Sequence, residues 1–352
     1  MMIPNLTDWI PGLPEELGLE CLTRLPYSAH SIASRVCRPW RSLLQSDEFY
    51  HHRRENGYTR KVACLVQALP PPPAPEAVEL TTGPKSPNGS PGYGIAVFDS
   101  ASRTWERLDP IPKYPSGLPM FCQLGSCQGK LVVMGGWDPV TYRPVTDVFV
   151  YDFTTCWWTK GKAMPSKRSF FAIGSHESRV YIAGGHDEGK NALKSAWAYD
   201  LRRDEWTELT QMSRERDECQ GVVIGDEFWV VSGYGTASQG AFEGGAEVLD
   251  IGSGRWRLVD GAWEEGQCPR ACGGGRIGRD GRLVSWAELD SAVRVGTRGV
   301  GLGSRTLVMG SEYEGAKQGM YIKDGGQNGK LERVTVPEEF CGFVQSGCCV
   351  EI

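Results

Sequence analysis

One pattern recurs four times along the chain, and it constrains the fold more than any other feature. In each copy a large apolar residue precedes an aspartate, and a tryptophan follows that aspartate six positions later. The successive tryptophans are 53, 48 and 50 residues apart. The pairs are Asp99 and Trp105, Asp152 and Trp158, Asp200 and Trp206, and Asp250 and Trp256. Self-similarity at a period near 50 predicts supersecondary units that stack on one another and share a core.

Upstream of three of these tryptophans, a short apolar stretch ends in small residues. The stretches cover residues 131–136, 180–185 and 228–233. They do not alternate apolar with polar residues, which indicates strands buried on both faces between neighbouring sheets. Glycines at the ends of such strands permit a positive φ and a close approach of two backbones.

The repeat resembles the kelch repeat, and that resemblance implies an all-β propeller of four-stranded blades. Its structural positions here are Gly135, Gly136, Gly184, Gly185, Trp158, Trp206 and Trp256. We expect six blades, with five as the alternative, because the pattern weakens at both ends of the region. The first copy lacks the glycine pair, and after Trp256 only residues 282–287 and 306–311 have the composition of further inner strands.

The propeller is expected to occupy residues 58–352, with an irregular segment near each end. Residues 70–92 lie between the expected strands 61–69 and 93–98 and are rich in Pro, Gly and Ser. They are predicted to form a flexible loop inside the first blade. Residues 340–352 have the composition of a strand, and we expect them to complete the first blade and close the ring.

Residues 1–57 have a helical pattern instead, and three short helices are expected. Pro14 suits a first helical turn, and the two glutamates after it suit the positive end of the helix dipole. Leu17, Cys21 and Leu25 recur with helical spacing and form an apolar stripe. Three short helices give a marginal core on their own, so the apolar stripe is a candidate for contact with a partner.

The order of residues in this helical unit resembles the F-box. The resemblance rests on residues 13–17, on Leu22 and Leu25, and on residues 36–44. It implies docking on a Skp-type adaptor and, through it, on a cullin. The adaptor-binding residues would be Leu13, Pro14, Glu15, Leu17, Leu22, Leu25, Val36, Trp40 and Leu43. The alternative is a helical cap on the β domain.

Composition excludes several classes of partner. The chain of 352 residues carries a formal net charge of -5, which leaves no basic excess for nucleic acid. No run of 18 apolar residues is present, so no membrane span is expected. The 12 cysteines are dispersed and no signal peptide precedes them. We therefore expect reduced thiols and a cytoplasmic or nuclear protein.

The sequence gives little support for catalysis, a cofactor or a metal. Residues 273–278 fit G-x-G-x-x-G, but a strand and no helix follows them, so a turn is the better explanation. Some kelch enzymes bind copper through Tyr and His, and some plant kelch proteins bind iron through a Glu-x₃-Asp-x₃-His triad. Eight positions before the five histidines stand Leu22, Leu43, Leu44, Arg168 and Ser178, and none is Glu. A non-catalytic protein without cofactor is expected, with a propeller metallo-oxidase as a weaker alternative.

An arginine recurs where each repeat begins, ten residues after the preceding tryptophan in two copies. In other kelch receptors an arginine at this position lines the substrate pocket and holds acidic side chains. That resemblance nominates Arg168, Arg216 and Arg270, together with the aromatic residues Trp137 and Tyr234, which are expected to be exposed. The alternative is that the arginines pair with nearby acids such as Glu215, Asp217 or Glu218.

The whole arrangement, including the ending 336–352, resembles a compact group of plant F-box/kelch proteins. Members of that group direct ubiquitylation of phenylalanine ammonia-lyase or of cytokinin response regulators. The resemblance therefore implies a substrate receptor of an SCF-type ubiquitin ligase that restrains phenylpropanoid metabolism or cytokinin signalling. The rival interpretation is a kelch scaffold, or an inhibitor of its partner, that acts without a ligase.

Overall fold

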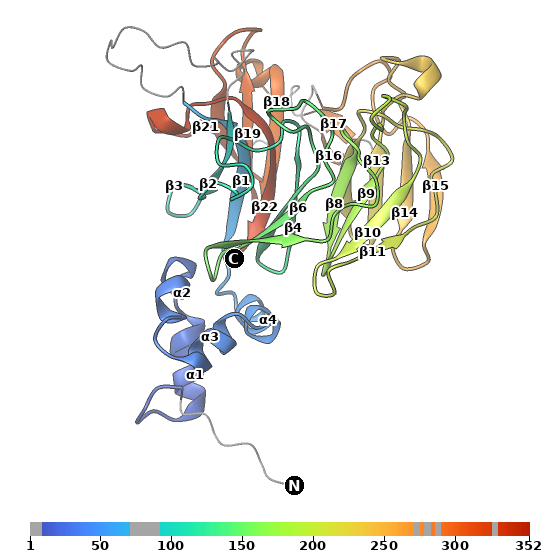
Figure 1. Ribbon diagram of the computed structural model, residues 1–352. Helices are drawn as coiled ribbons and strands as arrows, with labels where there is room; N and C mark the ends of the chain where they lie inside the picture. The colour runs from blue at the N-terminus through green and yellow to red at the C-terminus, as the bar shows by residue number, and fades with distance from the viewer. Residues whose placement is uncertain (1–8, 71–91, 271–274, 278–282, 286–289, 326–329) are drawn as a thin grey trace, which may run out of the picture.

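The chain forms a small helical unit below a ring of β-sheets (Figure 1). The computed structural model describes residues 9–70, 92–270, 275–277, 283–285, 290–325 and 330–352. Most of the expected loop at 70–92 and half of the glycine motif at 273–278 lie outside these ranges. No helix in the described ranges is long and apolar enough to cross a membrane.

The described N-terminal residues contain four helices rather than the three expected. They are α1 (Glu15–Thr23), α2 (Tyr27–Ala33), α3 (Arg38–Leu44) and α4 (Asp47–Glu55). The additional helix is α3, in the stretch that Pro39 opens. Ser46 takes an extended conformation and caps the helix that follows, α4. Its hydroxyl accepts a hydrogen bond from the backbone N–H of Phe49 at 3.1 Å. The core of the unit is small and consists of Leu22, Ala33, Leu44 and Phe49.

Five four-stranded antiparallel blades and one two-stranded sheet follow. Blade 1 comprises β22 (Val344–Glu351), β1 (Lys61–Ala68), β2 (Tyr93–Asp99) and β3 (Thr104–Arg107). Blade 2 comprises β4 (Gln123–Cys127), β5 (Lys130–Met134), β6 (Val148–Asp152) and β7 (Trp157–Gly161). Blade 3 comprises β8 (Ala172–His176), β9 (Arg179–Ala183), β10 (Ala196–Asp200) and β11 (Glu205–Glu208).

The remaining sheets complete the described ring. Blade 4 comprises β12 (Gln220–Ile224), β13 (Glu227–Val231), β14 (Ala246–Asp250) and β15 (Arg255–Val259). The two-stranded sheet pairs β16 (Gly275–Ile277) with β17 (Leu283–Ser285). Blade 5 comprises β18 (Val295–Leu302), β19 (Arg305–Ser311), β20 (Gly319–Asp324) and β21 (Leu331–Arg333). Short 3-10 helices cover Thr236–Ser238, Ser291–Val293 and Glu338–Phe340.

The described structure therefore matches five blades and not the six that we preferred from the sequence. The stretch between the end of β15 and the start of β18 is shorter than one repeat, and it carries no glycine pair followed by Asp and Trp at the repeat spacing. Of the two inner strands expected after Trp256, residues 306–311 form β19 in a full blade. Residues 283–285 of the other form one strand of the two-stranded sheet.

The repeated glycines and tryptophans fasten neighbouring blades. Gly184 of blade 3 has φ +67°, and a Cβ there would lie 2.5 Å from the carbonyl oxygen of Arg216, just before blade 4. Only glycine permits this approach of two backbones. Three of the four repeated indoles donate a hydrogen bond to a backbone carbonyl that follows the outer strand of the preceding blade, whereas the buried indole N–H of Trp105 has no partner in the described structure. The pairs are Trp158 with Asp109 at 2.7 Å, Trp206 with Lys162 at 2.9 Å, and Trp256 with Thr210 at 2.7 Å.

The ring closes through its first and last strands, which are far apart in sequence. β22 pairs antiparallel with β1, so that Val62 lies opposite Val350 and Cys64 opposite Cys348. In Figure 1 these two strands, blue and red, lie side by side above the helical unit. The residues of β1 from Val62 to Val66 are fully buried between neighbouring sheets.

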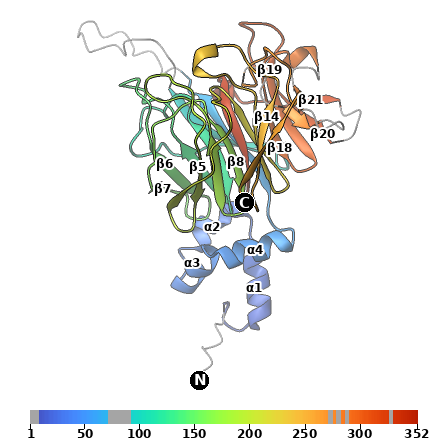
Figure 2. The ribbon, with the colours of Figure 1, turned by 90° about the vertical axis from the view of Figure 1, so that its right-hand side faces the viewer.

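The helical unit lies at one end of the ring, and Figure 2 shows the same arrangement from the side. The turn between β4 and β5 contacts α4, because a Cβ on Gly129 would lie 3.0 Å from the ring of Tyr50. The N-terminal ends of the inner strands therefore lie at the opposite end of the ring. The molecule presents two ends, one helical and one formed by loops.

Candidate functional site

Three large apolar side chains of the helical unit point into solvent. Leu17 of α1 is 54% exposed, Ile32 of α2 is 70% exposed and Val36 just after α2 is 62% exposed. Pro14 and Pro39, at the starts of α1 and α3, are exposed as well. An apolar surface on a unit with so small a core is typical of a protein-binding face. We call Leu17, Ile32 and Val36 the helical face.

The predicted adaptor-binding residues divide into two groups. Pro14, Leu17 and Val36 are exposed, and Leu13, Glu15, Leu25, Trp40 and Leu43 are half-buried. Leu22 is 1% exposed and belongs to the core, so the prediction that it contacts a partner is wrong. Leu25, Trp40 and Leu43 pack against that core, and the indole of Trp40 donates to the carbonyl of Trp9 at 2.6 Å. Ile32 was not among the predicted residues, although it lies on the same surface.

Two buried basic side chains hold the interior of the helical unit together. Arg53 of α4 donates hydrogen bonds to the carbonyl oxygens of Thr23, Leu25 and Tyr58 at 3.1, 3.1 and 2.8 Å. Burial lowers the pKa of Arg53 to about 10. His30 lies close by, and its burial and the positive charge of Arg53 lower its pKa to about 4. His30 is therefore neutral at pH 7.

The two arginines that begin repeats are part of the ring and not of its surface. Arg168 and Arg216 are each 1% exposed. Arg168 donates to the hydroxyls of Ser166 and Ser195 at 3.0 and 2.9 Å and to the carbonyl of Gly184 at 3.3 Å. The expectation that these residues hold a target's carboxylates is therefore wrong for this structure, because other groups of the ring already bind their guanidinium groups.

Arg216 has an acidic partner, but not one of those named from the sequence. Its Nε lies 3.3 Å from Glu247 of β14, which is also 1% exposed, and its Nη1 donates to the carbonyl of Ser232 at 2.8 Å. Glu247 also accepts hydrogen bonds from the backbone N–H groups of Ser213 and Arg214 at 2.6 and 3.1 Å. The pair thus ties the loop that begins blade 4 to the third strand of the same blade.

Aromatic rings gather where the inner strands of blades 2 and 3 begin. Phe121 and Phe170 occupy equivalent positions and have positive φ angles of 61° and 55°. Their ring centroids lie 4.7 Å apart, and Trp137 meets Phe121 edge-on at 6.3 Å. A left-handed backbone at two bulky residues is strained and marks a candidate functional site. We call Phe121, Phe170 and Trp137, all half-buried, the aromatic mouth.

The other nominated residues surround the aromatic mouth. Arg270 lies over the ring of Phe170 at 5.6 Å and donates to the carbonyl of Phe171, and burial lowers its pKa. Arg270 is only half-buried, so it is the one arginine of the three that a partner could reach. Tyr234 is 6% exposed and donates to Glu218 at 3.1 Å, so the expectation that it is exposed is wrong. Burial raises its pKa, so the phenol stays protonated.

Below the aromatic mouth, the inner strands enclose a cavity of about 80 Å³. Polar residues from four strands and one loop line it, namely Gln123, Gln220, Arg270, Arg298, Gln345 and Ser346. No carboxylate is among its lining residues. Elsewhere in the described part of the chain, no group of three or more His, Cys, Asp or Glu residues is placed to hold a metal ion.

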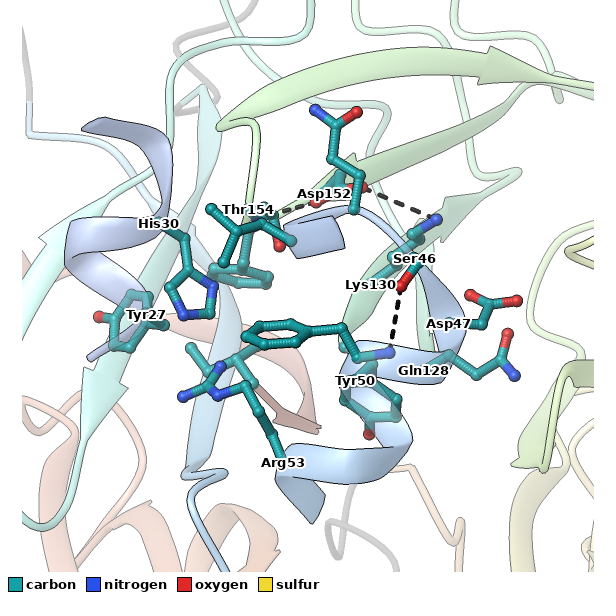
Figure 3. Close-up of a pocket in the computed structure, with 16 residues that line it drawn as sticks. Tyr27, His30, Ser46, Asp47, Tyr50, Arg53, Gln128, Lys130, Asp152 and Thr154 are labelled. Carbon is teal, nitrogen blue, oxygen red and sulfur yellow. Dashed lines mark hydrogen bonds and ion pairs between the residues drawn. The ribbon is translucent and has the colours of Figure 1, made fainter. Parts of the chain in front are cut away.

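The helical unit and the propeller meet in a third region (Figure 3). Side chains of α2 and α4 face the β4–β5 turn and the turn after β6, with Tyr27 and Tyr50 on one side and Lys130 and Thr154 on the other. Tyr27 meets Phe153 edge-on at 6.3 Å, and Arg54 lies 3.6 Å from Glu351. We call this region the junction. None of the residues that line its pocket belongs to the helical face or to the aromatic mouth.

Comparison with known proteins matches both parts of the chain. The F-box domain matches residues 10–52, and the KLHDC2/KLHL20/DRC7 Kelch-repeats domain matches residues 78–275. F-box/kelch-repeat protein At2g44130 of Arabidopsis thaliana is 42% identical over 302 residues, which cover 81% of this chain and 73% of the relative. F-box/kelch-repeat protein At1g15670 of the same plant is 34% identical over 364 residues, which cover 98% of this chain and 100% of the relative. F-box/kelch-repeat protein SKIP20, also from Arabidopsis thaliana, is 39% identical over 285 residues, which cover 73% of this chain and 67% of the relative.

Proposed function

From the premise that the chain belongs to the plant F-box/kelch-repeat family, we propose that it is the substrate receptor of an SCF-type ubiquitin ligase. The helical face binds a Skp-type adaptor, which links the receptor to a cullin. The loop end of the propeller binds the target. The observation that carries this proposal is the exposure of Leu17, Ile32 and Val36 on a domain that matches the F-box.

The receptor acts by proximity and supplies no reacting group. An adaptor on the helical face and a target at the far end of the ring are held by one chain. The lysines of the target then meet the ubiquitin-loaded enzyme at a high effective concentration, which accelerates transfer without new bond chemistry in the receptor. The protein is accordingly not an enzyme in its own right, and it needs no cofactor for this role.

The adaptor contact can be tested by placing a charge on the helical face. We expect Val36→Asp and Ile32→Asp each to weaken binding of the purified adaptor by about 30-fold or more, because a carboxylate buried in an apolar interface costs about 2 kcal/mol or more. The measurement is calorimetric titration of the full-length receptor with the adaptor. Because both positions are exposed, the free energy of unfolding should change by no more than about 0.5 kcal/mol.

Val140→Asp is the matched control. Val140 is 82% exposed on blade 2, outside the helical unit, so its substitution introduces the same charge away from the helical face. Equal adaptor binding by all three variants and the unchanged chain would contradict the proposal. It would favour the alternative of a kelch scaffold or inhibitor whose helices only cap the ring.

Two targets are candidates, phenylalanine ammonia-lyase and a cytokinin response regulator, since the chain resembles the plant group that directs ubiquitylation of these proteins. The aromatic mouth and Arg270 are the surface on which we expect the target to dock. Reconstituted ubiquitylation of each candidate by the receptor–adaptor–cullin complex distinguishes them. Modification of neither protein, with the adaptor bound, would remove both targets and retain the receptor role. A fluorescent fusion expressed in plant cells would test the proposed cytoplasmic or nuclear location.

A further inference from the structure

The linker between the helical unit and the propeller is short and bonded along its length. Only residues 56–60 separate the end of α4 from the start of β1. Tyr58 donates through its hydroxyl to Glu20 at 3.1 Å, and Thr59 donates to Glu351 at 2.7 Å. Arg60 extends the β1–β22 ladder through two backbone hydrogen bonds with Ile352, at 2.6 and 2.8 Å. A linker fixed in this way does not act as a flexible tether.

A second attachment lies away from the linker and depends on one side chain. Arg202 belongs to the turn between β10 and β11 of blade 3. Its Nε lies 3.0 Å from Asp47 at the start of α4 and 3.1 Å from Gln128 of blade 2. Its Nη2 lies 3.3 Å from Nε2 of His51, one turn further along α4. One guanidinium group therefore links the helical unit with two blades.

The repeat itself does not require an arginine at this position. In the equivalent turns the aspartate that ends the third strand accepts backbone hydrogen bonds, as Asp200 does from the N–H groups of Arg202 and Arg203 at 3.1 Å each. The side chain two residues after that aspartate is not needed for the turn. Blades 1, 2 and 4 carry Ala101, Thr154 and Gly252 there. The long cationic side chain is thus specific to the blade that faces the start of α4.

A third attachment is on α2. Tyr27 is half-buried and packs against the core between blades 1 and 2, where it meets Phe153 edge-on at 6.3 Å. Its hydroxyl donates to Glu106 of β3 at 3.4 Å. The linker, Arg202 and Tyr27 hold the helical unit at three separate places. A body held at three places cannot swivel about its linker.

We propose that Arg202 is a positioning residue that fixes the orientation of the propeller relative to the adaptor, and so determines which lysines ubiquitin reaches. This inference rests on the proposed receptor function. Arg202 lies outside both the helical face and the aromatic mouth, so it acts through Asp47 and α4. The Arg202–Asp47 pair is half-exposed and contributes little to folding, so its loss widens the range of orientations that the linker and Tyr27 still allow, and leaves both domains intact.

The test uses the receptor's own lysines as reporters, because it then needs no identified target. The full-length chain is assembled with adaptor and cullin, allowed to ubiquitylate itself, and analysed by mass spectrometry at each propeller lysine. We expect Arg202→Ala to lower the modification of the preferred lysine about 3- to 10-fold and to spread ubiquitin over other lysines, since misplaced reacting groups lose rate steeply. Adaptor affinity and melting temperature should stay unchanged.

Arg203→Ala is the matched control, because Arg203 lies in the same turn, has an exposed side chain, and bonds to Asp200 through its backbone N–H. It should leave the lysine pattern unchanged. Asp47→Asn should reproduce the Arg202→Ala pattern, and the double variant should add nothing further. Arg202→Lys should restore part of the original preference, since a lysine keeps the charge that faces Asp47.

Small-angle X-ray scattering of the isolated chain checks the same orientation without the ligase. We expect a broader distribution of domain orientations for Arg202→Ala than for Arg203→Ala. Identical lysine patterns and identical scattering of the two variants would overturn the inference. A lower melting temperature or weaker adaptor binding of Arg202→Ala would also overturn it, because Arg202 would then be structural. Loss of self-ubiquitylation in every variant, together with the unchanged chain, would instead count against the receptor function.

Discussion

The two ends of the molecule bind their partners with opposite kinds of surface. On the helical face, the apolar side chains of Leu17, Ile32 and Val36 are exposed to solvent. At the loop end, Arg168, Arg216 and Tyr234 are buried and bound to neighbours in the ring. The proposed adaptor-binding surface stands out because its apolar side chains are exposed. A target-binding surface built on a propeller is harder to recognise, because residues that look available are used by the ring.

The largest expected effect tests whether the buried arginines belong to the ring. Arg216→Met removes one partner of a buried ion pair and leaves Glu247 charged without it. We expect the free energy of unfolding to fall by about 3–5 kcal/mol, the usual cost of leaving a buried charge unpaired. Chemical denaturation of the full chain measures this change. An unchanged free energy of unfolding together with lost target binding would show that Arg216 belongs to the binding surface and does not stabilise the ring.

Arg214→Met is the control for that experiment. Arg214 lies two residues earlier and contacts Glu243 at 3.2 Å, but its side chain is 58% exposed. Its removal should cost no more than about 1 kcal/mol, since exposed ion pairs contribute little. Replacing Glu247 as well as Arg216 by apolar residues should recover much of the lost stability, because no charge is then left buried.

The next prediction is that the stability of the helical unit depends on pH more strongly than the stability of the propeller. His30 has a pKa of about 4 in the folded helical unit, below its ordinary value of 6.5. The unfolded state therefore binds a proton between pH 6.5 and 4 that the folded state does not bind, and stability falls as the pH is lowered through this window. At pH 4 we expect a loss of about 3 kcal/mol relative to pH 7. Amide hydrogen exchange resolves this loss in α1 to α4.

The exchange of the propeller strands supplies the internal reference for the pH experiment. As the pH is lowered, amide protection in α2 and α4 should decrease at a higher pH than amide protection in β9 or β13. His30→Gln removes the titrating ring, so the variant should lose this excess sensitivity of the helices. Helices that stay protected to pH 4 in the unchanged chain would show that His30 does not limit the stability of the helical unit.

The smallest effect on stability is expected at the aromatic mouth. Phe170→Gly removes a half-buried ring but places glycine at a φ of 55°, which glycine adopts without strain. These two changes oppose each other, so the free energy of unfolding should change by about 1 kcal/mol or less. Target binding should fall all the same. A measured loss of 3 kcal/mol or more, as expected for a core phenylalanine, would place Phe170 in the ring's core and not in its binding surface.

The sequence predicted the features that repeat. The tryptophans and the glycine pairs could be identified because each stands at a fixed spacing, which reflects one local geometry used several times. The preference for six blades failed where the repeat disappears, between β15 and β18. Three helices became four because the stretch that Pro39 opens forms a helix of its own, α3, which Ser46 separates from α4.

The sequence could not predict which side chains are already bound. The contact of Arg216 with Glu247 joins residues that are far apart along the chain, and several acids closer in sequence were equally plausible partners. Leu22 and Ile32 are both apolar residues of the helical pattern, and only the packing of the four helices decides that Leu22 is buried and Ile32 is not. The role of Arg202 could not be predicted either, because only the fold brings its turn against Asp47 and His51 of α4.

Closure of the ring by β1 and β22 has a consequence for biosynthesis. The ribosome releases β1 some 280 residues before its partner strand, and at about 5–20 residues per second the wait lasts tens of seconds. During that time an apolar strand has one unpaired edge, which invites aggregation. The helical unit, in contrast, can fold as soon as it emerges. A nascent chain is therefore able to engage its adaptor before its ring exists, and we expect chaperones to be most needed by chains that stop short of the last strand.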